Sequence, residues 1–539
     1  MRMKNNVLVK NVINNKWLVL LFNVLFFALM AWLLPIRFEV NDDAMMCMIA
    51  NGKFTSVPDV HLVYINAIYG WVLAKLYGWI PFLEWYTMLF CVLHVISVTG
   101  IVSVVLKNRE IQCGLKAIFL IFVYVIWIRI IIDFQFTTTS GLLCFSGCLV
   151  LLQPNRKWWL WGACAVFVAS LIRFYATGMV GVICAPLFFV SFIRDKKLIL
   201  WVLVLVLLVL GGWWADSLFY SSPEWAKYKA YDAARSAIVD APDNDLDESD
   251  LPEGISSEDY KLFCRSAADP NIMTLEKLLV IKTRIQENRK NRQAIPNLTQ
   301  LKVYRIPIVL LCVGFLFLIV TCIVERKMLP NRYGYLFPLF GLVIIVLLLF
   351  YLGITAVLKN RAFLCILFPI IYQMVFYCSF LDGSQVRKLS RYVIAGVVMG
   401  ITIKYAVQDF KVNQSDRKNY EMFLTDQKLL VDNTMDGQTR VIYPYEFYLD
   451  YISPFRIKDL CFRMGFGWFS NIPFDQNKMI SSYLDFVNSD VLWFANIEDS
   501  KVPVPVRVAN SIEKNYGIKV EAEKVDYNEK YALYKFVSK

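Results

Sequence analysis

The sequence predicts a polytopic α-helical membrane protein with about eleven transmembrane helices and a small external α/β domain at its C-terminus. Hydrophobic residues make up 58% of the 539 residues, and the mean hydropathy is +0.49. This apolar share exceeds the roughly 45–50% of ordinary soluble domains. Many apolar stretches reach the roughly 20 residues that a helix needs to cross a bilayer. Basic residues recur between these stretches.

The distribution of basic residues predicts the orientation of the chain. If the basic N-terminus is cytoplasmic, every even-numbered span returns the chain to the cytoplasm, and all five connections there are basic. This agrees with the positive-inside rule, so we expect the N-terminus inside and the C-terminus outside. The predicted spans are 17–35, 83–106, 114–132, 138–153, 158–173, 176–193, 198–214, 303–324, 335–353, 362–380 and 391–408.

One further apolar segment, residues 61–80, is not counted as a span. Counting it would invert the sidedness of every later loop. Its two glycines, Lys75 and several aromatic residues are typical of a helix that lies on the outer membrane interface.

The predicted topology leaves three parts outside the membrane. Two are loops, 36–82 and 215–302, within a membrane module that spans residues 1–409. The third is an external domain, 410–539. Its short apolar runs alternate with polar turns and predict strands in TRVIYPYEF, DVLWFAN, GIKVEAEKVD and YALYKFV, with a helix near 504–516.

Two external segments contain candidate residues for binding an acceptor substrate. Pro223 can begin a helix, on which Trp225, Tyr228, Tyr231 and Arg235 share one face. The segment GFGWFSNIPF (465–474), with Trp468 between glycine and aromatic neighbours, either lines an acceptor site or forms a domain turn. Tyr231, Arg235 and Trp468 are therefore the acceptor-site candidates.

Five cations lie at the outer ends of predicted spans, the side that normally avoids them. Arg37 can snorkel to the interface, and Arg129 can pair with Asp133 one helical turn away. Arg173, Lys359 and Arg361 have no acidic neighbour in the sequence. Ionisable groups at this depth indicate a functional site, and arginine binds phosphate with two parallel hydrogen bonds. Arg129, Arg173, Lys359 and Arg361 are therefore candidates for binding a phosphate.

The stretch RFEVNDDAMM places two adjacent carboxylates, Asp42 and Asp43, just after the first span. On a helix they point about 100° apart, so only one easily faces a given pocket. One of them, or Asn41, can instead cap the helix. A carboxylate near an apolar wall has a raised pKa and accepts protons better. Such a base beside a phosphate site predicts group transfer from a phosphorylated donor to a hydroxyl.

The sequence predicts no metal site and no nucleic-acid partner. The chain has two histidines, and most of its 13 cysteines lie in apolar runs without any CxxC pair. The acidic run DNDLDESD lacks the glycine and closing glutamate of a calcium loop, so a solvated loop is favoured. The formal net charge of +12 follows from cytoplasmic loops rather than from a nucleic-acid surface.

The motif NDDAMMCMIANGKF, after one N-in span and before interfacial helices, further spans and an external C-terminal domain, resembles the GT-C superfamily of polyprenyl-phosphate-sugar-dependent glycosyltransferases. FQFTTTSG, YKAYDAARSAIVDAP and GFGWFSNIP also resemble segments of bacterial GT-C-like proteins linked to surface polysaccharides. The resemblance implies an inverting hexosyl- or pentosyltransferase of the bacterial cytoplasmic membrane, acting extracytoplasmically without metal or other cofactor. By motif position Asp42 is the base. Because the second acidic residue is Asp rather than Glu, the roles of Asp42 and Asp43 remain exchangeable.

The implied partners are a polyprenyl-phosphate sugar, a surface glycan or glycolipid acceptor, and membrane lipid. Two other classes stay open: a polysaccharide polymerase or ligase that uses a lipid-pyrophosphate oligosaccharide, and a flippase or transporter of lipid-linked sugars. Transporters usually show internal repeats and interrupted helices at mid-membrane. The charges of this chain cluster at outer span ends instead.

Overall fold

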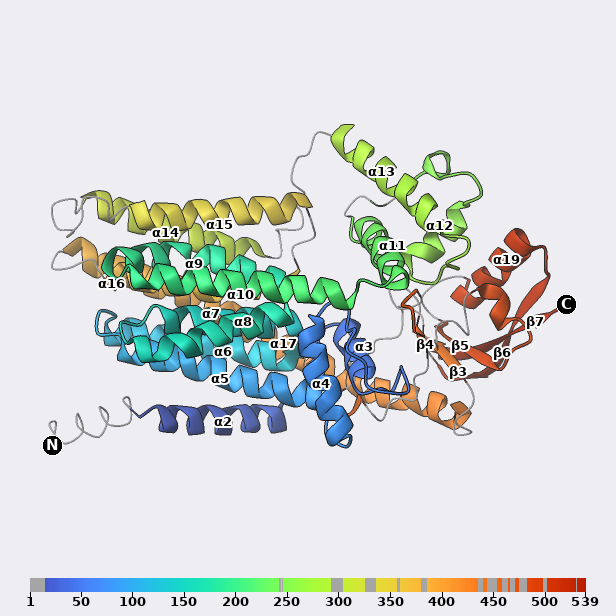
Figure 1. Ribbon diagram of the computed structural model, residues 1–539, viewed down its shortest axis with the longest axis horizontal. Helices are drawn as coiled ribbons and strands as arrows, with labels where there is room; N and C mark the ends of the chain where they lie inside the picture. Colours follow the sequence, from blue (N-terminus) through green and yellow to red (C-terminus); the bar gives the residue numbers. More distant parts are fainter. Residues whose placement is uncertain are drawn as a thin grey trace.

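The molecule is an elongated helical bundle with a mixed α/β region at one end (Figure 1). The computed structural model describes residues 15–241, 244, 246–291, 304–324, 336–355, 359–379, 385–434, 440–443, 453–457, 464–465, 471–474, 482–497, 502–529 and 531–539. The first described helix lies along the bundle, and the C-terminal strand lies at the opposite end of the long axis (Figure 1).

Each of the eleven predicted spans overlaps a helix, whereas their number as membrane crossings stays a prediction. Eight helices in the described part of the chain are long and apolar enough to cross a membrane, so the chain is a multi-pass membrane protein. Helices α7 and α8 are shorter, with 16 and 14 residues. The bundle helices are α2 (Lys16–Leu33), α5 (Trp85–Lys107), α6 (Cys113–Ile132), α7 (Phe136–Leu151), α8 (Trp159–Ile172), α9 (Phe174–Arg194), α10 (Lys197–Phe219), α14 (Arg305–Val324), α15 (Leu336–Thr355), α16 (Asn360–Ser379) and α17 (Gln385–Thr434).

Helix α7 is the central helix of the bundle, packed against α5, α8, α9 and α16. Nearly all its side chains are buried. It approaches α8 closely because Gly147 faces Gly162: an added Cβ at Gly147 would lie 2.8 Å from the Gly162 carbonyl oxygen. Burial inside protein explains how a helix of 16 residues belongs to the bundle.

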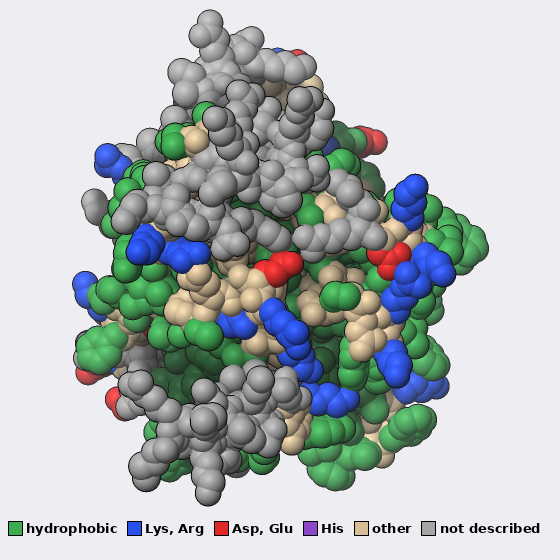
Figure 2. Space-filling view, turned by 90° about the vertical axis from the view of Figure 1, so that its left-hand side faces the viewer, with side chains coloured by type: hydrophobic (Ala, Val, Ile, Leu, Met, Phe, Trp, Pro, Cys, Tyr) green, Lys and Arg blue, Asp and Glu red, His purple; other side chains and the backbone are tan. Residues whose placement is uncertain are grey.

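The end of the bundle that contains the start of α2 is rich in Lys and Arg side chains. Figure 2 shows this end, where basic side chains lie between apolar helix ends and few acidic ones are visible. The basic residues at the helix ends there include Lys16, Lys107, Arg109, Arg156, Lys157, Lys196 and Lys197. The predicted N-in orientation places this end on the cytoplasmic side.

Segment 61–80 forms helix α4 (Ala67–Trp79), which has 13 residues and is too short to span a bilayer. It lies across the other end of the bundle, beside α3 (Asn41–Ala50) (Figure 1). Its tryptophans Trp71 and Trp79 are 50% and 76% exposed. Exposed tryptophans of this kind are typical of membrane interfaces, in agreement with the predicted interfacial helix.

A short parallel ribbon ties the first loop to the end of α6. Strand β1 (Arg37–Phe38) pairs with β2 (Asp133–Phe134), with Arg37 opposite Asp133 and Phe38 opposite Phe134. Helix α3 follows β1, and α7 follows β2. The ribbon therefore brings the first turns of these two helices together.

The region outside the bundle, which we call the external region, contains three helices of the second loop and a five-stranded mixed sheet of order β4-β3-β5-β7-β6. Strands β3, β5, β6 and β7 and helix α19 confirm the elements predicted in the tail. The elements are α11 (Pro223–Val239), α12 (Ser257–Cys264), α13 (Leu275–Asn291), β3 (Arg440–Tyr443), β4 (Met464–Gly465), β5 (Val491–Asn496), α19 (Val504–Tyr516), β6 (Val520–Tyr527) and β7 (Tyr531–Ser538).

The second loop and the tail share one apolar core, which joins side chains of α11, α12 and α13 to those of β5, α19 and β7. Buried Asp269 links them further, because it accepts hydrogen bonds from Tyr483 N (2.7 Å), Tyr516 Oη (2.8 Å) and Ser482 Oγ (3.0 Å). The external unit is thus built from two separate segments. The predicted boundary at 409/410 falls inside α17, which runs unbroken through it.

Candidate active site at the α3 end of the bundle

The two adjacent aspartates lie in the first turn of α3, where the helix dipole favours negative charge. The residue that caps this helix is Val40, and no side chain makes a capping hydrogen bond. Capping by Asn41 or by an aspartate is therefore not what positions this turn. We use "rim site" for Glu39, Asp42, Asp43, Tyr64, Arg173 and Arg361, which surround it.

Asp43 is fully buried and anchors α3 to two other helices. Its Oδ1 accepts hydrogen bonds from Tyr86 Oη of α5 (2.9 Å) and from the backbone N–H of Phe136 at the start of α7 (3.0 Å). Its Oδ2 is buried and has no hydrogen-bond partner among the described residues. Burial raises the pKa of Asp43 well above its usual value, although the Tyr86 hydrogen bond opposes the shift.

Asp42 points to a different side of the same turn and is only partly buried. Its charge acts on Tyr64 in the first loop, on Arg173 and on Asp232 of α11. Burial first, and then the charge of Asp42, raise the pKa of Tyr64 well above its usual value. Asp42 therefore faces the junction between the bundle and the external region.

Arg173 links α8 to α9 and lies among aromatic rings. Its guanidinium carbon is 5.2 Å from the centre of the Phe136 ring and 5.8 Å from that of Tyr64. Its Nη1 donates to the Tyr64 carbonyl at 3.4 Å. Within the described part of the chain it makes no ion pair. The charge of Arg361 acts on Arg173, so the two cations lie within electrostatic reach of each other.

Arg361 lies in the first turn of α16 and is partly buried. Its side chain makes no ion pair or hydrogen bond with any described residue. Its positive charge nevertheless acts on Asp43, on Glu39 and on Arg173. The structure thus brings together the predicted residues Asp42, Asp43, Arg173 and Arg361, which are far apart in the sequence.

Glu39 is a member of the rim site that the sequence analysis did not single out. Its backbone N–H extends the ribbon by donating to the Phe134 carbonyl (3.1 Å), and its buried Oε2 has no hydrogen-bond partner among the described residues. Burial, and then the charge of Asp133, raise its pKa to about 7, against the influence of nearby arginines. The only sequence signal was its position three residues before Asp42.

Arg129 has its charge compensated inside the protein. It forms an ion pair with Asp133, as the spacing of four residues predicted, and Nη1 lies 3.4 Å from Asp409 Oδ1 of α17. Asp133 also pairs with Arg37, whose Nη2 is 2.8 Å from Asp133 Oδ1. This arrangement, the "paired network", joins β1, α6 and α17. It favours the structural alternative for Arg129 over phosphate binding.

The remaining cation candidates also have acidic partners. Lys359 is exposed, and its Nζ lies 3.3 Å from Asp240 Oδ1 at the end of α11. Arg235 donates from Nε (2.9 Å) and Nη2 (2.8 Å) to Asp232 Oδ1. The Asp232 and Arg235 charges both act on Tyr64, so this pair borders the rim site.

The aromatic acceptor-site candidates are placed differently. Tyr231 is buried in the core of the external unit, away from solvent. Trp468 lies outside the described residues. Phe474, at the end of the same predicted segment, packs against Trp225 with ring centroids 5.6 Å apart. This end of the segment therefore contacts α11.

Two kinds of comparison bear on the chain. A family model described as "Domain of unknown function (DUF6311)" matches residues 67–255, and no curated protein matches. Two solved structures of ArnT from Cupriavidus metallidurans, one bound to undecaprenyl phosphate and one in the apo state, align with 96% of this chain and 97% of theirs. Both are 11% identical to this chain, with TM-scores of 0.38 and 0.39. The functional proposal rests on the charges and contacts of the rim site.

Proposed function

We propose that this protein is an inverting glycosyltransferase that transfers a sugar from a polyprenyl-phosphate donor to a hydroxyl of a surface glycan or glycolipid. The observation that carries the proposal is the rim site. There Arg173 and Arg361 make no ion pair with described residues, and the charges of Arg361 and of the partly exposed Asp42 both act on Arg173. Two cations and one accessible base are what transfer from a phosphate leaving group requires.

The two arginines are suited to binding the donor phosphate. Placing a cation in a poorly solvated environment is unfavourable unless an anion compensates it. A bound phosphate provides that anion, and a guanidinium can donate two parallel hydrogen bonds to it. The aromatic rings around Arg173 stabilise the guanidinium before the ligand arrives.

Accessibility distinguishes the two aspartates. A general base must come within hydrogen-bond reach of the acceptor hydroxyl. Asp43 is fully buried, with one oxygen bonded to Tyr86 and the Phe136 amide, whereas Asp42 is partly exposed. We therefore assign the base to Asp42 and the anchoring of α3 to Asp43.

In the proposed reaction Asp42 accepts the proton of the acceptor hydroxyl, and the oxygen of that hydroxyl attacks the anomeric carbon of the donor sugar. The bond between that carbon and the phosphate oxygen breaks, and its electron pair remains on the departing phosphate. Arg173 and Arg361 stabilise the added negative charge. Because attack occurs opposite to the leaving phosphate, the configuration at the anomeric carbon inverts.

The test is sugar transfer by the purified protein in liposomes, using labelled polyprenyl-phosphate hexoses and pentoses with a panel of glycolipid acceptors. Asp42→Asn should lower the transfer rate about 10²- to 10⁴-fold, the usual contribution of a general base. Asp43→Asn is the matched control, because an amide oxygen still accepts both anchoring hydrogen bonds, and it should keep a rate within about tenfold of wild type.

Full turnover by Asp42→Asn would exclude the assigned base. A lipid-pyrophosphate oligosaccharide is tested in parallel. If sugar is transferred from it but from none of the monophosphate donors, the protein is a ligase that uses a pyrophosphate donor.

A further inference from the structure

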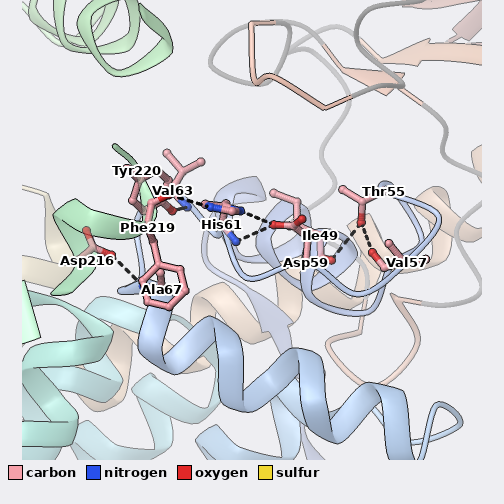
Figure 3. Close-up of polar contacts among 10 residues, drawn as sticks. All are labelled: Ile49, Thr55, Val57, Asp59, His61, Val63, Ala67, Asp216, Phe219 and Tyr220. Carbon is pink, nitrogen blue, oxygen red and sulfur yellow. Dashed lines mark hydrogen bonds and ion pairs between the residues drawn. The ribbon is translucent and has the colours of Figure 1, made fainter. Parts of the chain in front are cut away.

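A second polar cluster fastens the first loop to the corner between α10 and α11 (Figure 3). His61 is at its centre: Nδ1 lies 2.8 Å from Asp59 Oδ1, and Nε2 lies 3.2 Å from the Phe219 carbonyl oxygen. The ring stacks on Trp225 of α11, with centroids 4.6 Å apart and planes 21° apart, and Tyr220 packs edge-on against it. We call this cluster the loop latch.

The geometry of the loop latch selects the doubly protonated ring. One ring nitrogen faces Asp59 Oδ1 and the other faces the Phe219 carbonyl oxygen. An ionised carboxylate and a carbonyl oxygen can both accept a hydrogen bond but cannot donate one. A neutral imidazole carries a single N–H and can donate to one of them, whereas an imidazolium donates to both. Burial would raise the pKa of Asp59, but its hydrogen bonds with His61 outweigh that effect and lower it.

The other charged groups at this corner are Asp216 of α10 and Lys229 of α11. Asp216 Oδ1 accepts the backbone N–H of Ala67 at the start of α4 (2.8 Å) (Figure 3), and its Oδ2 lies 3.8 Å from Lys229 Nζ. Lys229 Nζ is 3.6 Å from the centre of the Tyr220 ring. Lys229 thus balances Asp216, leaving Asp59 as the carboxylate that pairs with His61.

The loop latch connects to the rim site through two residues. Val63 adopts a φ of 69°, an unfavourable backbone conformation for a β-branched residue. Its N–H donates to Tyr220 Oη (2.9 Å), which helps to hold it there (Figure 3). The next residue, Tyr64, contacts the Arg173 guanidinium with both its ring and its carbonyl oxygen.

We infer that His61 is a positioning residue of the rim site: its imidazolium holds the first loop on the α10–α11 corner, which keeps Tyr64 and Arg173 in place for an anionic ligand. The identity of that ligand, a polyprenyl phosphate, rests on the proposed function. The placement of the loop is independent of the proposed function.

Two measurements on the full-length protein test this inference. Amide hydrogen exchange of a peptide covering 51–66, corrected for intrinsic rates, reports on the loop at pH 5.5 to 8.5. Binding of a short-chain polyprenyl phosphate reports on the site. His61→Phe keeps the stacking on Trp225 but removes both hydrogen bonds. It should speed exchange at every pH and weaken binding about tenfold, raising the KM for the donor more than it lowers kcat.

His61→Arg is the rescue variant, because a guanidinium remains charged, stacks on Trp225 and can donate to both acceptors. It should restore slow exchange of 51–66. Asp59→Asn, a nearly isosteric change, should give a smaller effect in the same direction if His61→Phe does not fold. Lys227→Ala, at an exposed position of the same helix α11, is the control.

Equal exchange of 51–66 in wild type and His61→Phe at pH 6 would overturn the inference. So would fast exchange combined with unchanged binding of polyprenyl phosphate. If the wild type binds no polyprenyl phosphate although exchange depends on His61 as expected, the proposed donor is wrong while the latch itself is retained.

Discussion

Two groups of arginines lie at the same end of the bundle and differ in how their charge is compensated. In the paired network, Arg129 and Arg37 contact Asp133, and Arg129 also contacts Asp409. In the rim site, Arg173 and Arg361 make no ion pair with described residues. The difference indicates which cations hold the fold together and which are available to a ligand.

The paired network and the rim site both contain carboxylates, so their residue types alone do not explain why the arginines of only one group form ion pairs with described residues. The carboxylates of the paired network lie within contact distance of its guanidinium groups. In the rim site, Asp43 Oδ1 accepts hydrogen bonds from Tyr86 and a backbone amide. The backbone N–H of Glu39 donates a hydrogen bond to the Phe134 carbonyl. The rim carboxylates therefore leave the two rim arginines to an external anion.

The largest effect that tests this comparison is expected in the paired network. Arg129→Ala leaves Asp133 and Asp409 in a poorly solvated environment, so the free energy of unfolding in lipid–detergent micelles should fall by about 3–5 kcal/mol. Affinity for polyprenyl phosphate should be unchanged in the folded fraction. The double variant Arg129→Ala/Asp409→Asn, which removes one stranded charge, should recover part of the loss. Weaker phosphate binding without loss of stability would move Arg129 into the rim site.

An effect of intermediate size is expected from the rim arginines. Arg173→Ala or Arg361→Ala should each weaken polyprenyl phosphate binding by about 1.5–3 kcal/mol, roughly 10- to 150-fold, the range of hydrogen bonds to charged groups. Unfolding free energy without ligand should stay the same or rise, because a poorly solvated cation is removed. Isothermal titration and chemical unfolding measure the two quantities.

Lys359→Ala is the matched control for Arg361, since it lies two residues away but is exposed and paired with Asp240. Its effect on binding should remain below about 1 kcal/mol. Equal losses from Lys359→Ala and Arg361→Ala would show that the phosphate binds at the surface turn rather than in the rim site.

The smallest effect concerns Glu39, whose pKa is raised to about 7 by burial and by Asp133. The folded protein therefore binds this proton more tightly than the unfolded chain. Its stabilising contribution is complete below the usual glutamate pKa and is lost as the pH rises through about 7. Glu39→Gln should thus leave stability unchanged near pH 4 and raise it at pH 8, by the order of 1 kcal/mol after screening.

Thermal unfolding of Glu39→Gln and wild type across this pH range measures that difference. The exposed residue Glu253, substituted by Gln, provides the baseline. A difference between Glu39→Gln and wild type that does not vary with pH would show that Glu39 does not titrate with a raised pKa.

The resemblance to GT-C enzymes directed attention to the first loop, whose acidic pair lies near two arginines that make no ion pair with described residues. It could not rank the two aspartates. Asp42 and Asp43 are adjacent and chemically identical, and only the contacts of Tyr86 and the Phe136 amide with Asp43 distinguish them. Glu39 and His61 were missed for the same reason, since their roles come from burial and from partners distant in the chain.

The sequence by itself determined the helices of the bundle, the short helix within 61–80, the strands of the tail and the helix over 504–516. These depend on the hydrophobicity and periodicity of neighbouring residues, which local segments express wherever they are placed. Only the tertiary structure decided that Arg129 meets Asp409, 280 residues away, that the second loop and the tail share one core, and that Arg173 and Arg361 converge. Apart from local pairs such as Arg129–Asp133, burial and charge compensation depend on which distant segments the fold brings into contact.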